Sequence, residues 1–161
     1  MAASPVHPSQ PRHQPELAAT VAALETVDVP QQHPERPFHV PARHNPKLTK
    51  LLDGINTEEV HQLWRCANVN AVDRSQITDH GPVHIRIVGN IALRLLRLLD
   101  EAGVEFSICK NYGLEKEDAE VVVVLAAALH DVGISIHRAN HEQYSLILAA
   151  PLARAILSGI Y

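Results

Sequence analysis

Six residues in the second half of the chain are of types that bind metal ions. They are His80, His84, His130, Asp131, His137 and His141. Imidazole nitrogens suit first-row transition metals, and a carboxylate adds a hard oxygen ligand. His130 and Asp131 end the most apolar segment of the chain, where a carboxylate is costly unless it is paired or bound to a metal. The alternative is a local cap in which these two side chains hydrogen-bond only each other.

The remaining histidines also have simpler explanations. His84 extends the apolar stripe of Val88 and Ile91, and an unsatisfied polar group there would cost about 1–3 kcal/mol. Taken alone, His84 is a hydrogen-bonded core histidine; the His130-Asp131 doublet is what favours a shared metal site. The alternative for the later histidines is a solvated surface position.

Three segments carry a family resemblance: 79–84 (DHGPVH), 87–90 (IVGN) and 127–133 (AALHDVG). A histidine opens one helix, a His-Asp doublet follows 46 positions later, and a further histidine lies just beyond. This ordered set, within about residues 75–157, resembles the HD-domain metal-dependent phosphohydrolase superfamily. The resemblance implies an all-α helical bundle, one or two bound divalent metals, and hydrolysis of phosphate esters.

The resemblance also assigns roles to individual residues. His84 corresponds to the first metal-binding histidine, and His130 and Asp131 correspond to the doublet. The implied cofactor is a divalent metal ion such as Mn, Fe, Zn or Mg. Asp131 would also orient the attacking water, and His141 or His137 would stabilise the phosphoryl group or bind a second metal. His80 would assist the phosphate or only fix the loop before the helix.

Two departures from the family pattern concern the second half of the site. Ile134 and Ser135 stand where many members have a phosphate-binding lysine. The family's last metal ligand is an aspartate on a later helix, but after Asp131 the sequence has no aspartate, and Glu142 is its only carboxylate side chain. We therefore expect a domain that is incomplete at its C-terminus. We also expect a partly exposed apolar face over 146–157, with homo-oligomerisation as one outcome.

Helical signals that would position these residues begin after Pro46. Residues 47–54 suggest a short helix. A second helix starts over 57–60, with Thr57 or Asn56 as its cap and acids in its first turn. The Gly81-Pro82 pair opens a longer helix that Gly103 closes. Its predicted core-facing stripe consists of Val88, Ile91, Ala92, Leu95 and Leu99.

A further helix is predicted from Lys116 or Glu117 to Asp131. Its segment 121–129 is apolar all round, which by periodicity is either a buried strand or a buried helix, and the alanines and preceding acids favour the helix. Asn140 is expected to cap a last helix that Pro151 interrupts or kinks. The only period-two pattern of a strand covers 104–108, so the predicted class is all-α.

The N-terminal part differs from the rest in composition. Nine of the eleven prolines lie in residues 1–46, with five histidines that follow no metal-ligand spacing. Closely spaced prolines prevent helix and sheet from propagating, except for a marginal helix over 15–24. The predicted division is a disordered Pro/His-rich tail over 1–46 and a partial HD-like helical domain over 47–161.

Composition excludes several functional classes. Of 161 residues, 46% are hydrophobic, which is enough for a core, while a net charge of -4 argues against general nucleic-acid binding. The longest apolar stretch has nine residues, against about 20 for a membrane span, and no signal peptide precedes it. Cys66 and Cys109 form no CxxC pair, which favours a reducing compartment and a cytoplasmic location. Neither a P-loop nor a GxGxxG turn occurs.

The function expected from these patterns is that of a metal-dependent phosphohydrolase. It would use a metal-activated water to cleave a phosphate mono- or diester, including a nucleotide or cyclic dinucleotide. Its partner would be a phosphorylated small molecule, not a membrane. Two alternatives stay open: a catalytically inactive metal- or nucleotide-binding HD-like regulatory module, and a helical interaction domain whose histidines are incidental.

Overall fold

The apolar segment 121–129 forms a helix and not a strand. In the computed structural model, which describes residues 36–161, helix α6 spans Lys116–Leu129. Its start is fixed by a capping box, in which the side chains of Glu115 and Asp118 each accept a hydrogen bond from the backbone of the other residue. Because α6 buries residues on most of its faces, it has little amphipathic periodicity.

The other elements in residues 36–161 are also helical, and no strand occurs there. They are α2 (Pro46–Ile55), α3 (Glu58–Asn68), the π-helical η1 (Val69–Arg74), α4 (Pro82–Glu101), α5 (Ser107–Tyr112), the 3-10 turn η2 (Val132–Ser135) and α7 (His141–Leu157). The all-α prediction is thus confirmed for this part of the chain. Residues 104–108 run through a loop into the start of α5 and do not form a strand.

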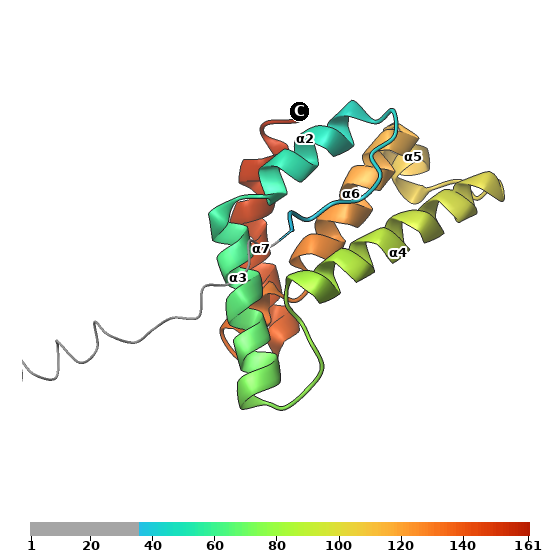
Figure 1. Ribbon diagram of the computed structural model, residues 1–161. Coiled ribbons are helices and arrows are strands. Elements are labelled where there is room, and N and C mark those ends of the chain that lie inside the picture. Colours follow the sequence, from blue (N-terminus) through green and yellow to red (C-terminus); the bar gives the residue numbers. More distant parts are fainter. Residues whose placement is uncertain (1–35) are drawn as a thin grey trace, which may run out of the picture. The chain divides into compact units, whose positions relative to one another are not determined.

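Helix α4 packs along α6 (Figure 1). Helix α2 contacts both α6 and α7. The short turn η2 packs against α3 and α7 and links the end of α6 to the last helix. The core between these helices is mainly aliphatic, as expected. Its largest fully buried side chains include Trp64, Leu48, Ile55, Ile85 and Leu93.

The helical unit begins earlier than the predicted boundary at residue 46. Phe38 and Val40 are buried in the core, and Asn45 caps α2 by accepting a hydrogen bond from the backbone of Leu48 at 3.0 Å. A Cβ on Gly89 of α4 would lie 2.8 Å from the ring of Phe38, so this segment packs closely on α4. The boundary at 46 is therefore wrong for residues 36–45; residues 1–35 of the predicted tail lie outside the described residues.

The core-facing side of α4 is not the predicted stripe. Its fully buried positions are Ile85, Gly89 and Leu93, while Ile91 and Leu95 are 54% and 55% exposed. Leu99 is also exposed, and Val88 and Ala92 are half-buried. Apolar residues occupy more than one side of this helix, so periodicity could not choose among them. The side that packs is the one on which Gly89 permits the close approach of Phe38.

The last helix differs from its prediction at its cap, and Pro151 does not interrupt it. Asn140 precedes α7, but its backbone is left-handed (φ 59°) and its side chain makes no capping hydrogen bond. The helix also continues through Pro151 as one element. By contrast, α3 has one of its two predicted caps: the hydroxyl of Thr57, and not Asn56, caps the helix by accepting a hydrogen bond from the backbone of Val60 at 3.4 Å. Within residues 36–161, no helix has both the length and the apolar composition needed to cross a membrane.

Candidate metal centre

His84 occupies the third position of α4, where the preceding loop fixes its backbone. The carboxylate of Asp79 accepts a hydrogen bond from the backbone of His84 at 2.9 Å, which satisfies one of the free donors of this helix start. The side chain of Asn68, at the end of α3, accepts from the backbone of His80 at 3.1 Å. A Cβ on Gly81 would lie 2.8 Å from Asn68, so glycine permits this close approach. Together these contacts set the position at which α4 begins.

His130 and Asp131 follow the last residue of α6. The indole nitrogen of Trp64 donates to the carbonyl oxygen of Ala128 at 2.8 Å, which fastens this helix end to α3. Nδ1 of His130 lies 2.9 Å from the carbonyl oxygen of Ala127. When Nδ1 carries the proton for this bond, Nε2 is left with its lone pair free. An outer hydrogen bond of this kind is usual for a histidine that ligates a metal.

The two helix ends bring three side chains together. Nε2 of His84 lies 3.4 Å from Oδ2 of Asp131, and Nε2 of His130 lies 3.0 Å from the same oxygen. The ligand atoms of all three residues lie within 4.8 Å of one another. The imidazole rings of His84 and His130 are 5.6 Å apart between centroids. The predicted convergence of these residues at one end of the helical core is confirmed.

The donor set and its spacing fit a divalent metal ion. Typical bonds from zinc to histidine nitrogen or carboxylate oxygen place ligand atoms about 3.4 Å apart around one tetrahedral ion. The two measured separations from Oδ2 of Asp131, 3.4 and 3.0 Å, are close to this value. Two imidazoles with one carboxylate leave coordination positions for water or substrate, as catalytic sites require. His84, His130 and Asp131 could therefore hold such an ion.

A fourth side chain, His141, lies on the other oxygen of the carboxylate. Its Nε2 is 3.5 Å from Oδ1 of Asp131, and its Nδ1 is 3.1 Å from the carbonyl oxygen of Arg138. The first turn of α7 is held against η2, because the backbone of Gly133 donates to the buried hydroxyl of Ser145 at 2.9 Å. This contact places His141 beside the trio.

The other two predicted histidines differ in position. The ring of His80 stacks on that of His84 with centroids 5.0 Å apart, and its Nδ1 lies 2.6 Å from the carbonyl oxygen of Thr78. His80 therefore supports His84 from the loop. His137 is exposed and accepts a hydrogen bond from the backbone of Ala139 at 3.0 Å. Among the described residues, nothing connects the His137 side chain to the trio.

The charges of the cluster are coupled. Burial raises the pKa of Asp131, but the hydrogen bond to His130 and the neighbouring imidazoles outweigh this effect, so the pKa lies below its ordinary value. The same hydrogen bond raises the pKa of His130 above 6.5. Burial lowers the pKa of His84, and His80 and His130 act in the same direction. As the pH rises, His84 therefore loses its proton before His130 does.

Sequence reasoning missed one basic residue near the site. A guanidinium nitrogen of Arg138 lies 3.1 Å from Nδ1 of His141, which places a permanent positive charge close to the cluster. The feature of the sequence that could have indicated Arg138 is its position between two candidate site histidines, His137 and His141. Glu142, the only later carboxylate side chain, lies 3.4 Å from Nδ1 of His141 and is not one of the grouped ligands within the described part of the chain.

An apolar groove of about 610 Å³ adjoins the cluster between α6 and α7. His130, Glu142 and Ser145 are its polar lining residues. Its apolar lining side chains include Val122, Ala126 and Leu146. On α7, Leu146 and Ile147 are exposed, whereas Leu152 and Leu157 are partly buried against the core. The expected partial exposure of 146–157 is thus observed.

Comparison with known proteins gives one relative of unassigned function. An uncharacterized protein of Methanocaldococcus jannaschii is 36% identical over 107 residues, which is 66% of this chain and 41% of the relative. The chain thus spans about two fifths of the length of that protein. No known family matches the chain. No solved structure matches it either.

Proposed function

We propose that this chain carries the metal site of a phosphohydrolase of the HD-domain type, acting on a phosphate mono- or diester such as a nucleotide or cyclic dinucleotide. The observation that carries the proposal is the convergence of His84, His130 and Asp131, with ligand atoms within 4.8 Å, from the ends of two different helices. If His130 and Asp131 only formed a hydrogen-bonded cap at the end of α6, there would be no reason for His84, which lies on α4, to approach them.

A divalent ion held by this trio would lower the pKa of a coordinated water and polarise a phosphoryl oxygen. Asp131 presents Oδ2 to both imidazoles and Oδ1 to His141, so one carboxylate can orient the water while it helps to hold the ion. In its protonated form, His141 can donate from Nε2 to a phosphoryl oxygen beside Asp131. The guanidinium of Arg138 can stabilise the negative charge of the phosphoryl group, in place of the missing lysine. Phosphate would approach between α7 and the trio.

The second candidate is a metal- or nucleotide-binding regulatory module without turnover. It is favoured because, among residues 36–161, no further carboxylate joins the trio as a ligand that could hold the same ion. Loss of such a ligand typically reduces affinity or activity at least about 10–100-fold. In both cases we place the protein in the cytoplasm, because Cys66 and Cys109 are free thiols.

The test combines metal content with turnover of two generic substrates. The full chain is loaded in turn with Mn, Fe, Zn and Mg and dialysed, and its metal content is measured. Hydrolysis of p-nitrophenyl phosphate and bis-p-nitrophenyl phosphate is then followed. We expect H84A and D131N to lose the bound metal and any turnover, and R138Q to keep the metal but lose turnover.

The matched control is H39A, because His39 is an exposed histidine far along the chain from the trio. Metal retained equally by H84A, D131N and wild type would exclude the site. Metal bound in one equivalent with no turnover on either substrate would select the regulatory module.

A further inference from the structure

A second polar site lies on α4, about 20 Å from His84 along the helix, since 13 residues separate His84 from Arg97. Asn90, Arg94, Arg97 and Glu101 recur at spacings of four, three and four, so they share one side of α4. Together with Arg43 they line a hollow of about 440 Å³. Three of the four charged side chains in this hollow are arginines.

Arg97 is held rigidly at the base of this hollow. Its Nε donates to Oε1 of Glu120 at 2.6 Å, and its side chain is only 12% exposed. The second oxygen of Glu120 accepts from the amide of Asn45 at 2.9 Å, and that amide also donates to the carbonyl oxygen of Glu117 at 3.0 Å. With Nε committed to Glu120, the two terminal nitrogens of Arg97 have no partner among the described residues. They remain available as donors to a ligand.

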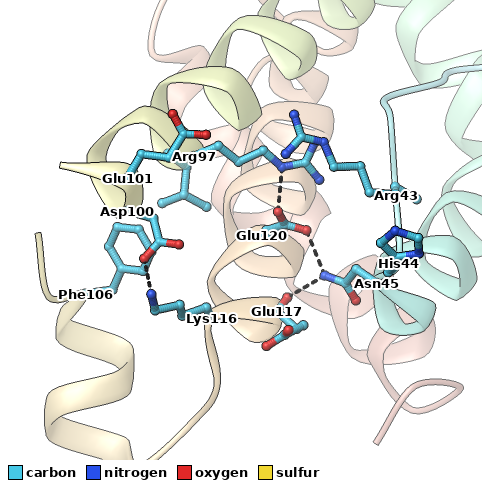
Figure 2. Close-up of a pocket in the computed structure, with 12 residues that line it drawn as sticks. Arg43, His44, Asn45, Arg97, Asp100, Glu101, Phe106, Lys116, Glu117 and Glu120 are labelled. Carbon is cyan, nitrogen blue, oxygen red and sulfur yellow. Dashed lines mark hydrogen bonds and ion pairs between the residues drawn. The ribbon is translucent and has the colours of Figure 1, made fainter. Parts of the chain in front are cut away.

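Arg43 reaches the same place from the loop before α2. Figure 2 shows its side chain directed toward the guanidinium of Arg97. The backbone of Arg43 is left-handed (φ 54°), a conformation that costs a non-glycine residue free energy. Neither Arg43 nor Arg94 has a charged partner among residues 36–161. The positive charges of Arg43 and Arg97 therefore converge here. Of the nearby carboxylates, Glu120 is already engaged by Arg97 and Asn45, and Glu101 also lines the hollow.

The acidic groups lie mainly on the other side of Arg97. The charged side chains that line an adjoining hollow of about 280 Å³ are four acids and three bases: Asp100, Glu101, Glu117, Glu120, Arg43, Arg97 and Lys116. Lys116 pairs with Asp100, and Arg97 pairs with Glu120 (Figure 2). In the 440 Å³ hollow, Glu101 is the only acid. Arg43 and Arg97 line both hollows, and the positive excess is therefore on the side of Arg94.

We propose that Arg43, Arg94 and Arg97 form a binding site for the phosphate group of a small anionic ligand, separate from the metal centre. Guanidinium groups bind phosphate and carboxylate through paired hydrogen bonds. Here they come from two different elements, a loop and a helix. A tetrahedral phosphate offers oxygens in several directions and fits this arrangement better than a planar carboxylate.

The test measures binding of pyrophosphate to the full chain by calorimetry, with EDTA present so that no metal contributes. We expect one pyrophosphate per chain at 0.15 M salt, and at least about tenfold weaker binding by R43G and R94Q. R43G is the sharper variant, because glycine accepts a left-handed backbone and should leave the melting temperature unchanged or raised. R154Q removes one exposed charge from α7 and serves as the matched control, with binding unchanged.

Succinate is the comparison ligand, and we expect it to bind more weakly than pyrophosphate. No pyrophosphate binding by wild type, or equal binding by R43G, R94Q and R154Q, would overturn the site. Succinate bound as tightly as pyrophosphate would overturn its assignment to phosphate. H84A should bind pyrophosphate as wild type does, so this result is independent of the metal centre; loss of binding in H84A would place the anion at the histidines instead.

Discussion

The backbone of Gly133 lies directly against the backbone of His141, because a Cβ at Gly133 would overlap with the carbonyl oxygen of His141. This contact joins η2, which follows Asp131, to the first turn of α7. It is the relationship that brings His141 to 3.5 Å from the Asp131 carboxylate. The same glycine belongs to the AALHDVG segment that carried the family resemblance.

We predict that G133A separates α7 from η2. An added methyl group cannot be relieved by a side-chain rotation, because its neighbours are the backbone of His141 and the backbone and hydroxyl of Ser145. The free energy of unfolding should fall by about 1–3 kcal/mol. Urea unfolding followed by the fluorescence of Trp64, the sole tryptophan and a buried one, measures this change. G159A, whose Cβ would meet only Ile156 O at an ordinary 3.5 Å, should be close to neutral; equal losses in both variants would contradict the argument.

The packed side of α4 can be distinguished from the predicted stripe by two alanine substitutions. L93A should lower the free energy of unfolding by about 2–5 kcal/mol, because Leu93 is 1% exposed and its loss leaves a cavity. L95A should change it by less than about 0.5 kcal/mol, since Leu95 projects into solvent. Chemical denaturation of both variants gives the comparison. A larger loss of stability in L95A than in L93A would show that the side of α4 expected from periodicity is the packed one.

Asp118 connects three segments and should make the fold sensitive to acid. It is buried, pairs with Lys47 at 2.7 Å, and accepts hydrogen bonds from the hydroxyl of Tyr161 and the backbone of Glu115. Burial raises the pKa of Asp118, but these partners outweigh burial and hold it below 3.8. Burial, and after it the hydrogen bond to Asp118 and the negative charge of that residue, raise the pKa of Tyr161 to about 12, although the charge of Lys47 lowers it.

Because the folded pKa of Asp118 is lowered, its contribution to stability is present above pH 3.8 and lost as the pH falls through the folded pKa. We expect D118N to be less stable than wild type by about 1–3 kcal/mol at pH 7. The difference should shrink below about pH 4, as wild type also becomes protonated. Thermal unfolding between pH 3 and pH 7 tests this. D53N, at an exposed aspartate of α2, should follow wild type throughout.

Metal affinity should increase with pH because His130 must lose a proton to bind a metal. Its pKa is raised above 6.5 through Asp131, so below that raised pKa the apparent affinity should fall about tenfold per pH unit. Above it, affinity should level off. Competition titration with cobalt from pH 5.5 to 8.5 gives the profile. A flat profile in wild type would show that His130 is not a ligand; H39A should match wild type.

The sequence alone determined which residues could carry the chemistry and which class of structure holds them. His84, His130 and Asp131 were selected by residue type, by their place at helix ends and by the family resemblance. The capped start of α3 was predicted to within one residue, at Thr57 or Asn56, because such local signals depend on a few neighbouring residues. The acids before 121–129 likewise favoured a helix for α6, through the charge of the helix start.

Only the tertiary structure decided how these helices meet. The side of α4 that carries Gly89 and Leu93 is the buried one, and Gly89 packs on Phe38, which comes from a segment that its prolines had assigned to the tail. Arg138 became part of the site because Gly133 holds α7 against η2, a contact between backbones that leaves no periodic signal. The convergence of Arg43 with Arg97 likewise joins a loop to a helix 54 positions away. Long-range packing makes these choices, and local sequence patterns do not encode them.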